Sequence, residues 1–135
     1  YMFLGSLNQR QKELFIQLCI HAALANGIIE SEESILIDEY CKEMAIDNPG
    51  TKASISMKDA LLELKSISST QELNIITFEI AAIFVSDGEY TEDEIYFMDE
   101  LTNAFNIDEE KVEKMINQIE EYNFLFKEIS KSILE

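Results

Sequence analysis

An acidic loop around Gly88 is the part of this sequence whose residue types best suit chemistry. Residues 87–94 read DGEYTEDE. When Gly88 is placed at the turn position of an EF-hand loop, Asp87 and Glu94 fall on positions that supply oxygen ligands to calcium. The first half of such a loop is missing, because apolar residues stand where its first ligands belong. The sequence therefore excludes a complete EF-hand and predicts a partial oxygen cage for a cation.

The ligand types of this loop favour a hard cation. Ca²⁺ and Mg²⁺ accept carboxylate and carbonyl oxygens, whereas Zn²⁺ prefers nitrogen and sulfur ligands, which the loop lacks. Asp87 also ends a predicted helix, where the helix dipole disfavours negative charge by about 0.3–1 kcal/mol, and a bound cation would remove that cost. The alternative needs no metal: Asp87-Gly88 stops one helix, and Thr91 with Glu94 forms a capping box that starts the next.

The same pattern occurs earlier in the chain. A shift of 61 residues lays 14–47 over 75–108 without a gap. The matched loop residues are Gly27 with Gly88, Glu33 with Glu94, and Asn26 with Asp87. We interpret these segments as two copies of one helix–loop–helix unit related by an approximate two-fold axis. If the two loops come together, Glu33 and Asn26 join Asp87 and Glu94 as candidate metal ligands.

Helical periodicity and capping signals predict an all-α fold. Residues 75–85 are apolar on nearly every side, which is typical of a central, fully buried helix. Helix starts are expected after Asn8, Glu30 or Ser31, Ser56, Ser69, Thr91 and Asp108. The last helical region is expected to bend near Tyr122-Asn123, and no stretch has the period-two pattern of a strand. We predict one compact domain over residues 2–135, a bundle of about six or seven helices.

Composition limits the classes of partner. The chain has 135 residues, 47% of them hydrophobic, and a formal net charge of −17. Such a charge disfavours nucleic acids and anionic membranes, and it favours cations and basic protein partners. The longest apolar run, 80–85, is far shorter than the ~18 residues of a membrane span. We therefore expect a cytoplasmic protein without direct membrane insertion.

Other reactive residues have simpler interpretations. His21 is the single histidine and has no nucleophile motif beside it, so a structural role is favoured. Cys19 and Cys41 form no CxxC motif and are expected to be small buried side chains in a reducing compartment. Glu79 is the one carboxylate within the predicted central helix, where burial would require a hydrogen-bonding partner or protonation.

The ordered motifs resemble the tellurite-resistance TerB family, which includes the N-terminal domain of DjlA-type co-chaperones. The similarity covers nearly the whole chain. Its motifs are Leu7-Asn8 with Gln11-Lys12, Ala25-Asn26-Gly27 with Glu33, residues 86–90 with Glu94, and Phe105-Asn106-Ile107. The resemblance implies an all-helical fold with internal symmetry and an acidic divalent-cation site. Asn26 replaces the family's usual Asp, and its amide can offer one carbonyl oxygen.

From the residues and this resemblance we expect a non-catalytic acidic module of a bacterial stress system. It would bind a divalent cation at Asp87, Glu94, Glu33 and Asn26, with a basic protein or a membrane-complex component as partner. The alternative is an interaction adaptor or homodimer without metal, in which exposed aromatics such as Tyr96, Tyr122, Phe124 and Phe126 make the contact; these phenylalanines otherwise belong to the core. A metal-dependent hydrolase is the least supported class, because no histidine base or phosphate-binding glycine loop accompanies the acids.

Overall fold

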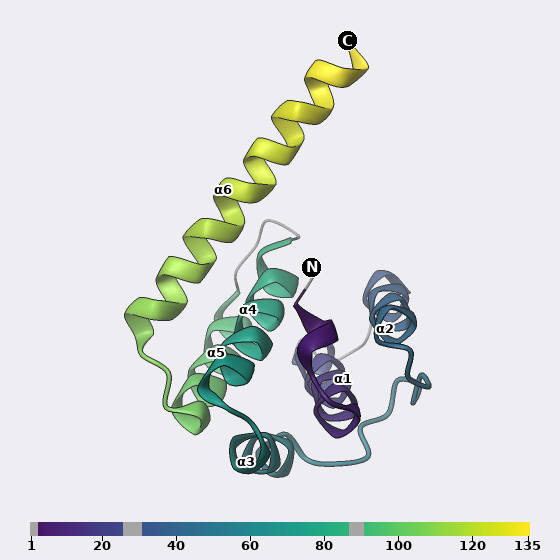
Figure 1. The fold of residues 1–135 in the computed structure, drawn as a ribbon, viewed down its shortest axis with the longest axis vertical. Helices are drawn as coiled ribbons and strands as arrows, with labels where there is room; N and C mark the ends of the chain where they lie inside the picture. The colour runs from purple at the N-terminus through teal and green to yellow at the C-terminus, as the bar shows by residue number, and fades with distance from the viewer. Residues whose placement is uncertain (1–2, 26–30, 87–90) are drawn as a thin grey trace.

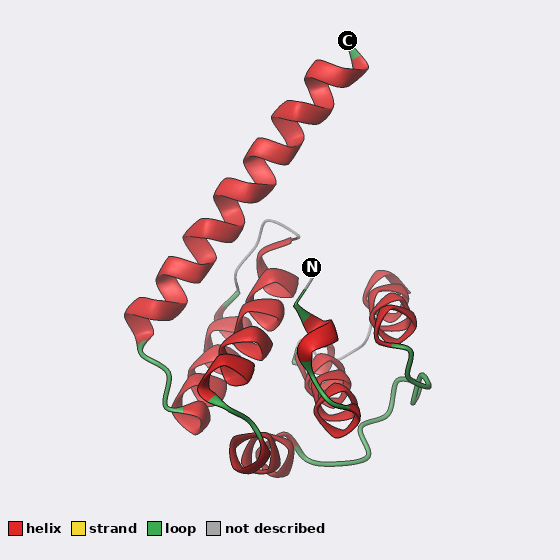
Figure 2. Cartoon of the chain, in the orientation of Figure 1, coloured by secondary structure: helices red, strands yellow, loops and turns green. Residues whose placement is uncertain are grey.

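The chain folds into a bundle of helices. The computed structural model describes residues 3–25, 31–86 and 91–135, and Figure 2 shows that the regular structure within these ranges is all helical. The elements are the 3₁₀ helix η1 (Leu4–Ser6) and the α-helices α1 (Gln9–Leu24), α2 (Ser31–Met44), α3 (Met57–Ile67), α4 (Thr70–Ser86), α5 (Glu92–Phe105) and α6 (Glu109–Leu134). The six α-helices of the described residues confirm the predicted all-α bundle.

Two central helices organise the core. In Figure 1, α1 and α4 lie in the middle, with α2 against α1 on one side and α5 and α6 against α4 on the other. The helix α3 closes the base by packing on α1 and α5. Leu14, Leu18, Ile76 and Ile80 have no exposed surface. The apolar stretch predicted to be central is therefore buried, and it shares the centre with α1.

The helix boundaries repeat along the chain with the predicted offset. Both α2 and α5 contain 14 residues, and their first residues, Ser31 and Glu92, are 61 apart. The first residues of α1 and α4, Gln9 and Thr70, are also 61 apart. An edge-to-face aromatic pair joins the helices within each unit: Phe15 with Tyr40, and Phe84 with Phe97. Local signals thus start and stop both units at equivalent places.

The two central helices begin with equivalent capping boxes. The Asn8 side chain accepts a hydrogen bond from the Gln11 amide at 2.9 Å, and the Gln11 side chain accepts one from the Asn8 amide at 2.8 Å. Ser69 and Glu72, 61 residues further on, make the same pair of bonds at 3.2 and 2.8 Å. The fully buried Gln11 also donates to the Ser68 hydroxyl at 3.0 Å. This bond ties the start of α1 to the C-cap residue of α3, just before α4.

The last helix differs from the prediction in two respects. The Asp108 side chain makes no capping hydrogen bond, although Asp108 occupies the cap position. The helix runs without interruption from Glu109 to Leu134, so the expected bend near Tyr122-Asn123 is wrong. At about 1.5 Å per residue, its 26 residues extend about 39 Å. Figure 1 shows that only its first part lies beside the bundle, while the rest projects beyond it.

Candidate interaction site

The predicted metal ligands lie only partly within the described residues. Asn26 and Asp87 are outside them. Glu33 and Glu94 are described, and each is the third residue of its helix, α2 and α5 respectively. The repeat therefore places these two carboxylates at equivalent helix starts, where the helix dipole favours negative charge.

Glu94 caps its own helix. Its Oε1 accepts a hydrogen bond from the Thr91 amide at 2.9 Å, while the Thr91 hydroxyl accepts one from the Glu94 amide at 3.2 Å. The residue is only 5% exposed. The capping-box prediction is confirmed here, and one carboxylate oxygen of Glu94 has a structural role independent of any metal.

The helices that carry Glu33 and Glu94 lie on opposite sides of the central pair, as Figure 1 shows. Among residues 3–25, 31–86 and 91–135, no three His, Cys, Asp or Glu side chains are grouped as a metal ion would require. The predicted joining of both loops at one cation involves Asn26 and Asp87, which are not described. Metal binding at these four residues stays a prediction.

The carboxylate of Glu79 is buried inside the bundle. It has no exposed surface, and burial raises its pKa from the ordinary 4.5 to about 7. The negative charge of Glu43 contributes to this rise in pKa, and the Tyr40 side chain opposes it. Because Tyr40 lies on α2 and Glu79 on α4, this interaction links an outer helix of one unit to the central helix of the other.

His21 and the cysteines are structural in this fold. The Nε2 atom of His21 lies 2.7 Å from the carbonyl oxygen of Ile55. A carbonyl can only accept, so Nε2 carries the proton and ties α1 to the segment before α3. Cys19 and Cys41 are free and buried, and burial raises the pKa of both thiols. Neither thiol is therefore an activated nucleophile.

A surface hollow of about 470 Å³ lies beside the first half of α1. Its lining includes Arg10, Glu13 and Gln17 from α1, together with Asp47 and Pro49 from the connection between α2 and α3. Of the described candidates, Glu33 and Glu94 do not line this hollow, and neither do Glu79, His21 or the cysteines. Its mixed polar walls show no grouping of acid, base and nucleophile that would identify a reaction.

The most unusual surface is the outer part of α6. Val112, Met115 and Ile119 are buried where the helix packs on α4. Beyond Ile119 the helix still carries large apolar side chains, but most of them are exposed. The exposed members are Tyr122, Phe124, Leu125, Phe126, Ile129, Ile133 and Leu134, between 49% and 85% exposed. We call residues 122–134 the projecting segment.

The apolar side chains of α6 form one continuous seam. Seven of them alternate in spacing between three and four residues: Val112, Met115, Ile119, Tyr122, Phe126, Ile129 and Ile133. This is the heptad spacing that aligns side chains along one face for packing against another helix. The helix α4 covers the first part of the seam. The rest of the seam, from Tyr122 to Ile133, continues along the same face with side chains that are 49% to 74% exposed.

The projecting segment also differs from the bundle in charge. Residues 122–135 contain two lysines, Lys127 and Lys131, and two acids, Glu128 and Glu135. They cancel, so residues 1–121 carry the whole formal charge of −17. The seam is flanked at 123, 125, 130 and 132 by Asn, Leu, Ser and Ser, none of them charged. An apolar, neutral helix therefore extends from a strongly acidic body.

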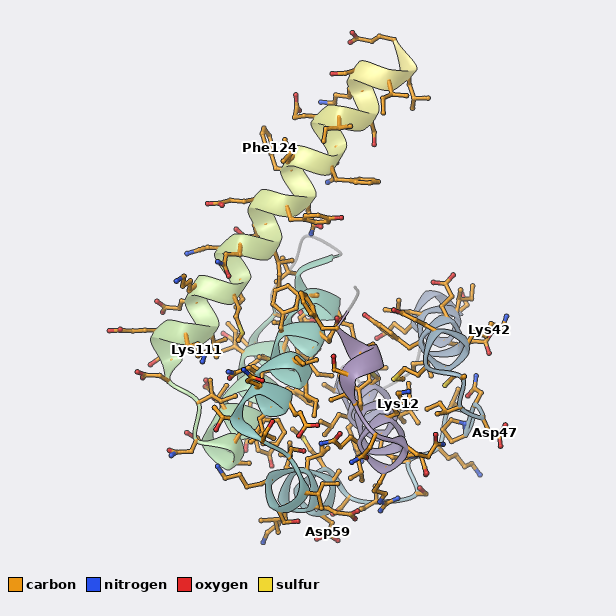
Figure 3. The ribbon with its side chains drawn as sticks, viewed as in Figure 1. Lys12, Lys42, Asp47, Asp59, Lys111 and Phe124 are labelled. Atoms are coloured by element: carbon orange, nitrogen blue, oxygen red, sulfur yellow. The ribbon has the colours of Figure 1, made fainter. Side chains whose placement is uncertain are left out.

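The predicted placement of Phe124 and Phe126 in the core is wrong, because their side chains are 66% and 60% exposed. Figure 3 shows Phe124 pointing away from the bundle. Periodicity locates an apolar face but does not reveal how far the covering helix reaches. The end of α4 decides where the cover stops.

Comparisons with known proteins do not assign a function to the surfaces described above. Within the described residues, no helix combines the length and apolar character that crossing a membrane requires. Comparisons of the chain with protein-family models, with curated proteins and with solved structures find no match. The TerB-like resemblance therefore stays a prediction that rests on the motifs alone.

Proposed function

We propose that this chain is a non-catalytic binding module whose contact surface is the projecting segment of α6. One observation carries this proposal: the apolar seam continues past the end of its cover, with large side chains exposed from Tyr122 to Leu134. The four exposed seam side chains, Tyr122, Phe126, Ile129 and Ile133, are 49% to 74% exposed and leave on the order of 400 Å² of one face in water. Patches of this size on soluble proteins mark interaction sites.

The cost of keeping this surface exposed supports a binding role. Each large apolar side chain left in water forgoes about 1.5–3 kcal/mol of burial free energy. A purely structural helix could end at Ile119, its last buried residue. Helix-in-groove and helix-on-helix binding both use apolar side chains at this spacing. Together with the TerB-like motifs, this leads us to place the module in a cytoplasmic bacterial stress system, acting through protein contacts.

Photo-crosslinking in cells of the native host tests this proposal. A photoreactive phenylalanine analogue replaces Leu125, which flanks the exposed seam, and in a control it replaces Glu113, an exposed α6 residue beside the bundle. We expect irradiation to give a covalent protein adduct at position 125 and none at 113. Equal adducts at both positions, or none at either, would contradict a binding role for the projecting segment.

Divalent-cation binding is the second candidate function. It is supported by the equivalent placement of Glu33 and Glu94 at the starts of α2 and α5, next to the acidic loops. In this version Asp87, Glu94, Glu33 and Asn26 supply the oxygens, and Ca²⁺ or Mg²⁺ is preferred to Zn²⁺. A cation would lower the charge of a −17 chain and so ease contact with an acidic partner. Its test, a cation titration of Glu94 variants, is given in the Discussion.

A further inference from the structure

We infer that the partner of the projecting segment is a second copy of this chain, paired antiparallel along residues 122–134. This inference rests on the proposed function, because it identifies what covers the same surface. It commits to one occupant on three grounds: the seam is complementary to itself, the segment is the neutral part of an acidic chain, and its area is enough for a weak dimer.

The exposed seam maps onto itself under a two-fold axis. In an antiparallel pair of identical helices, a residue a given number of positions before the two-fold axis lies opposite the residue of the other copy that is the same number of positions after it. With the axis midway between Lys127 and Glu128, Tyr122 meets Ile133 of the other copy, and Phe126 meets Ile129. Every exposed seam residue then has a seam residue opposite, each layer pairing one ring with one isoleucine. A two-fold interface requires this self-complementarity of a single surface.

The aromatic side of this seam is already ordered in the single chain. The rings of Tyr122 and Phe126 stack with centroids 6.5 Å apart and planes 22° from parallel. Two rings held in this way lose little side-chain entropy on binding, which favours association. The partner helix would extend the packing that α4 gives to the first part of the seam.

Charge favours the antiparallel orientation. Residues 1–121 of each copy, which we call the body, carry a formal charge of −17. The first part of α6 lies beside this body, and the projecting segment extends away from it (Figure 1). A parallel pair would bring the two bodies to the same end, whereas an antiparallel pair puts them at opposite ends. The uncharged flanking positions 123, 125, 130 and 132 neither repel a second copy nor attract a basic helix. Repulsion between the bodies therefore selects the orientation without ion pairs at the seam.

The area sets the strength of the expected dimer. The pairing covers 13 residues on each helix, about 20 Å of length. Four seam side chains per copy, with Leu125 beside them, bring the total burial to about 900 Å², which is the size of weak, transient interfaces. We expect a dimer that dissociates on dilution. Because salt screens the repulsion between the acidic bodies, added salt should strengthen the dimer, whereas it would weaken the binding of a basic partner.

Sedimentation velocity of the purified chain over about a hundredfold range of concentration tests the pairing. We expect the mass to rise from 15.5 kDa toward twice that value, and to do so at lower concentration in higher salt. The double variant Phe126→Ser, Ile129→Ser should stay monomeric. The matched control is Phe124→Ser, which removes an equally exposed ring from the face opposite the seam and should leave the dimer intact. A wild-type chain that is monomeric throughout, or a control that loses the dimer equally, overturns the inference.

Spin labels at Glu110→Cys, near the start of α6, test the orientation. The antiparallel pair predicts a separation of about 50 Å along the helix axes, whereas a parallel pair in register would bring the labels to about the 10 Å between neighbouring helix axes. Short distances therefore refute the antiparallel arrangement. A monomeric purified chain that still gives a crosslink at Leu125 to a different protein would overturn the second copy as partner and leave the proposed function standing. A monomer without that crosslink would remove both.

Discussion

Ala45 and Asn106 lie 61 residues apart and end equivalent helices in the same left-handed backbone conformation, with φ of 56° and 58°. The same closing hydrogen bond is found at the end of each helix. The amide of Ile46 donates to the carbonyl of Cys41 at 3.0 Å, and the amide of Ile107 donates to that of Thr102 at 2.9 Å. The repeat thus extends to the way in which α2 and α5 stop.

Replacing Ala45 by glycine should stabilise the chain. A left-handed alanine costs roughly 1–2 kcal/mol, which glycine avoids, and the greater freedom of glycine in the unfolded chain cancels part of that gain. We expect Ala45→Gly to raise the free energy of unfolding by about 0.5–1 kcal/mol in urea titrations. Asn106→Gly is the matched control and should gain less, because asparagine tolerates this conformation. A larger gain at 106 than at 45 would contradict this account.

The buried Glu79 should make stability depend on pH. Its folded pKa of about 7 lies above the ordinary 4.5, so the folded state holds the proton more tightly. Stability from this group is full below pH 4.5 and falls as the pH rises toward 7, by a total on the order of 3 kcal/mol. Glu79→Gln should remove most of this fall in denaturant titrations from pH 4.5 to 8. An unchanged slope would show that Glu79 does not govern it.

Tyr40 should modulate the same titration. The Tyr40 hydroxyl lowers the pKa of Glu79, so Tyr40→Phe should raise that pKa further and steepen the loss of stability with pH. A carboxyl chemical shift of Glu79 followed by NMR measures the pKa directly. If Tyr40→Phe lowers the pKa of Glu79 instead, the Tyr40 hydroxyl does not favour the charged form of the carboxylate.

Two isoleucines on the same seam of α6 should respond differently to truncation. Ile119 is 1% exposed against α4, and Ile129 is 49% exposed on the projecting segment. Ile119→Ala should lower the free energy of unfolding by about 2–5 kcal/mol, because it leaves a cavity. Ile129→Ala should change it by about 0.5 kcal/mol or less when the chain is monomeric. Dilute samples followed by circular dichroism in urea make the comparison, and equal losses would refute the projecting geometry.

Variants of Glu94 can separate helix capping from cation binding. Glutamine keeps an acceptor for the Thr91 amide, so Glu94→Gln should leave stability nearly unchanged, while Thr91→Ala should cost about 1 kcal/mol. If Glu94 also binds a cation, Ca²⁺ or Mg²⁺ should produce saturable amide shifts near Gly88 in the wild type. Glu94→Gln should weaken this response strongly, because a neutral amide is a poorer ligand. A saturable wild-type response that glutamine does not weaken would exclude Glu94 as a ligand, and no response at all would leave only its capping role.

Local sequence signals are sufficient to locate the helices of this protein. Capping residues such as Ser56, Ser69 and Thr91 mark where helices begin, because their side chains satisfy the first free amides of a helix. Apolar periodicity identified the buried side of α4 and the seam of α6. The offset of 61 residues followed from matched residues alone, since the same local sequence produces the same helix boundaries twice.

Which helix, if any, covers each apolar helix face depends on tertiary packing. The apolar spacing of the α6 seam is the same before and after Tyr122. Only the part beside α4 is buried, because burial depends on how far the packed helix α4 extends. The effect of Tyr40 on the pKa of Glu79 likewise involves residues 39 apart in the chain, and no local sequence pattern predicts it. Burial and contact arise from packing between segments that are far apart in sequence, whereas helix formation depends on neighbours within a few residues.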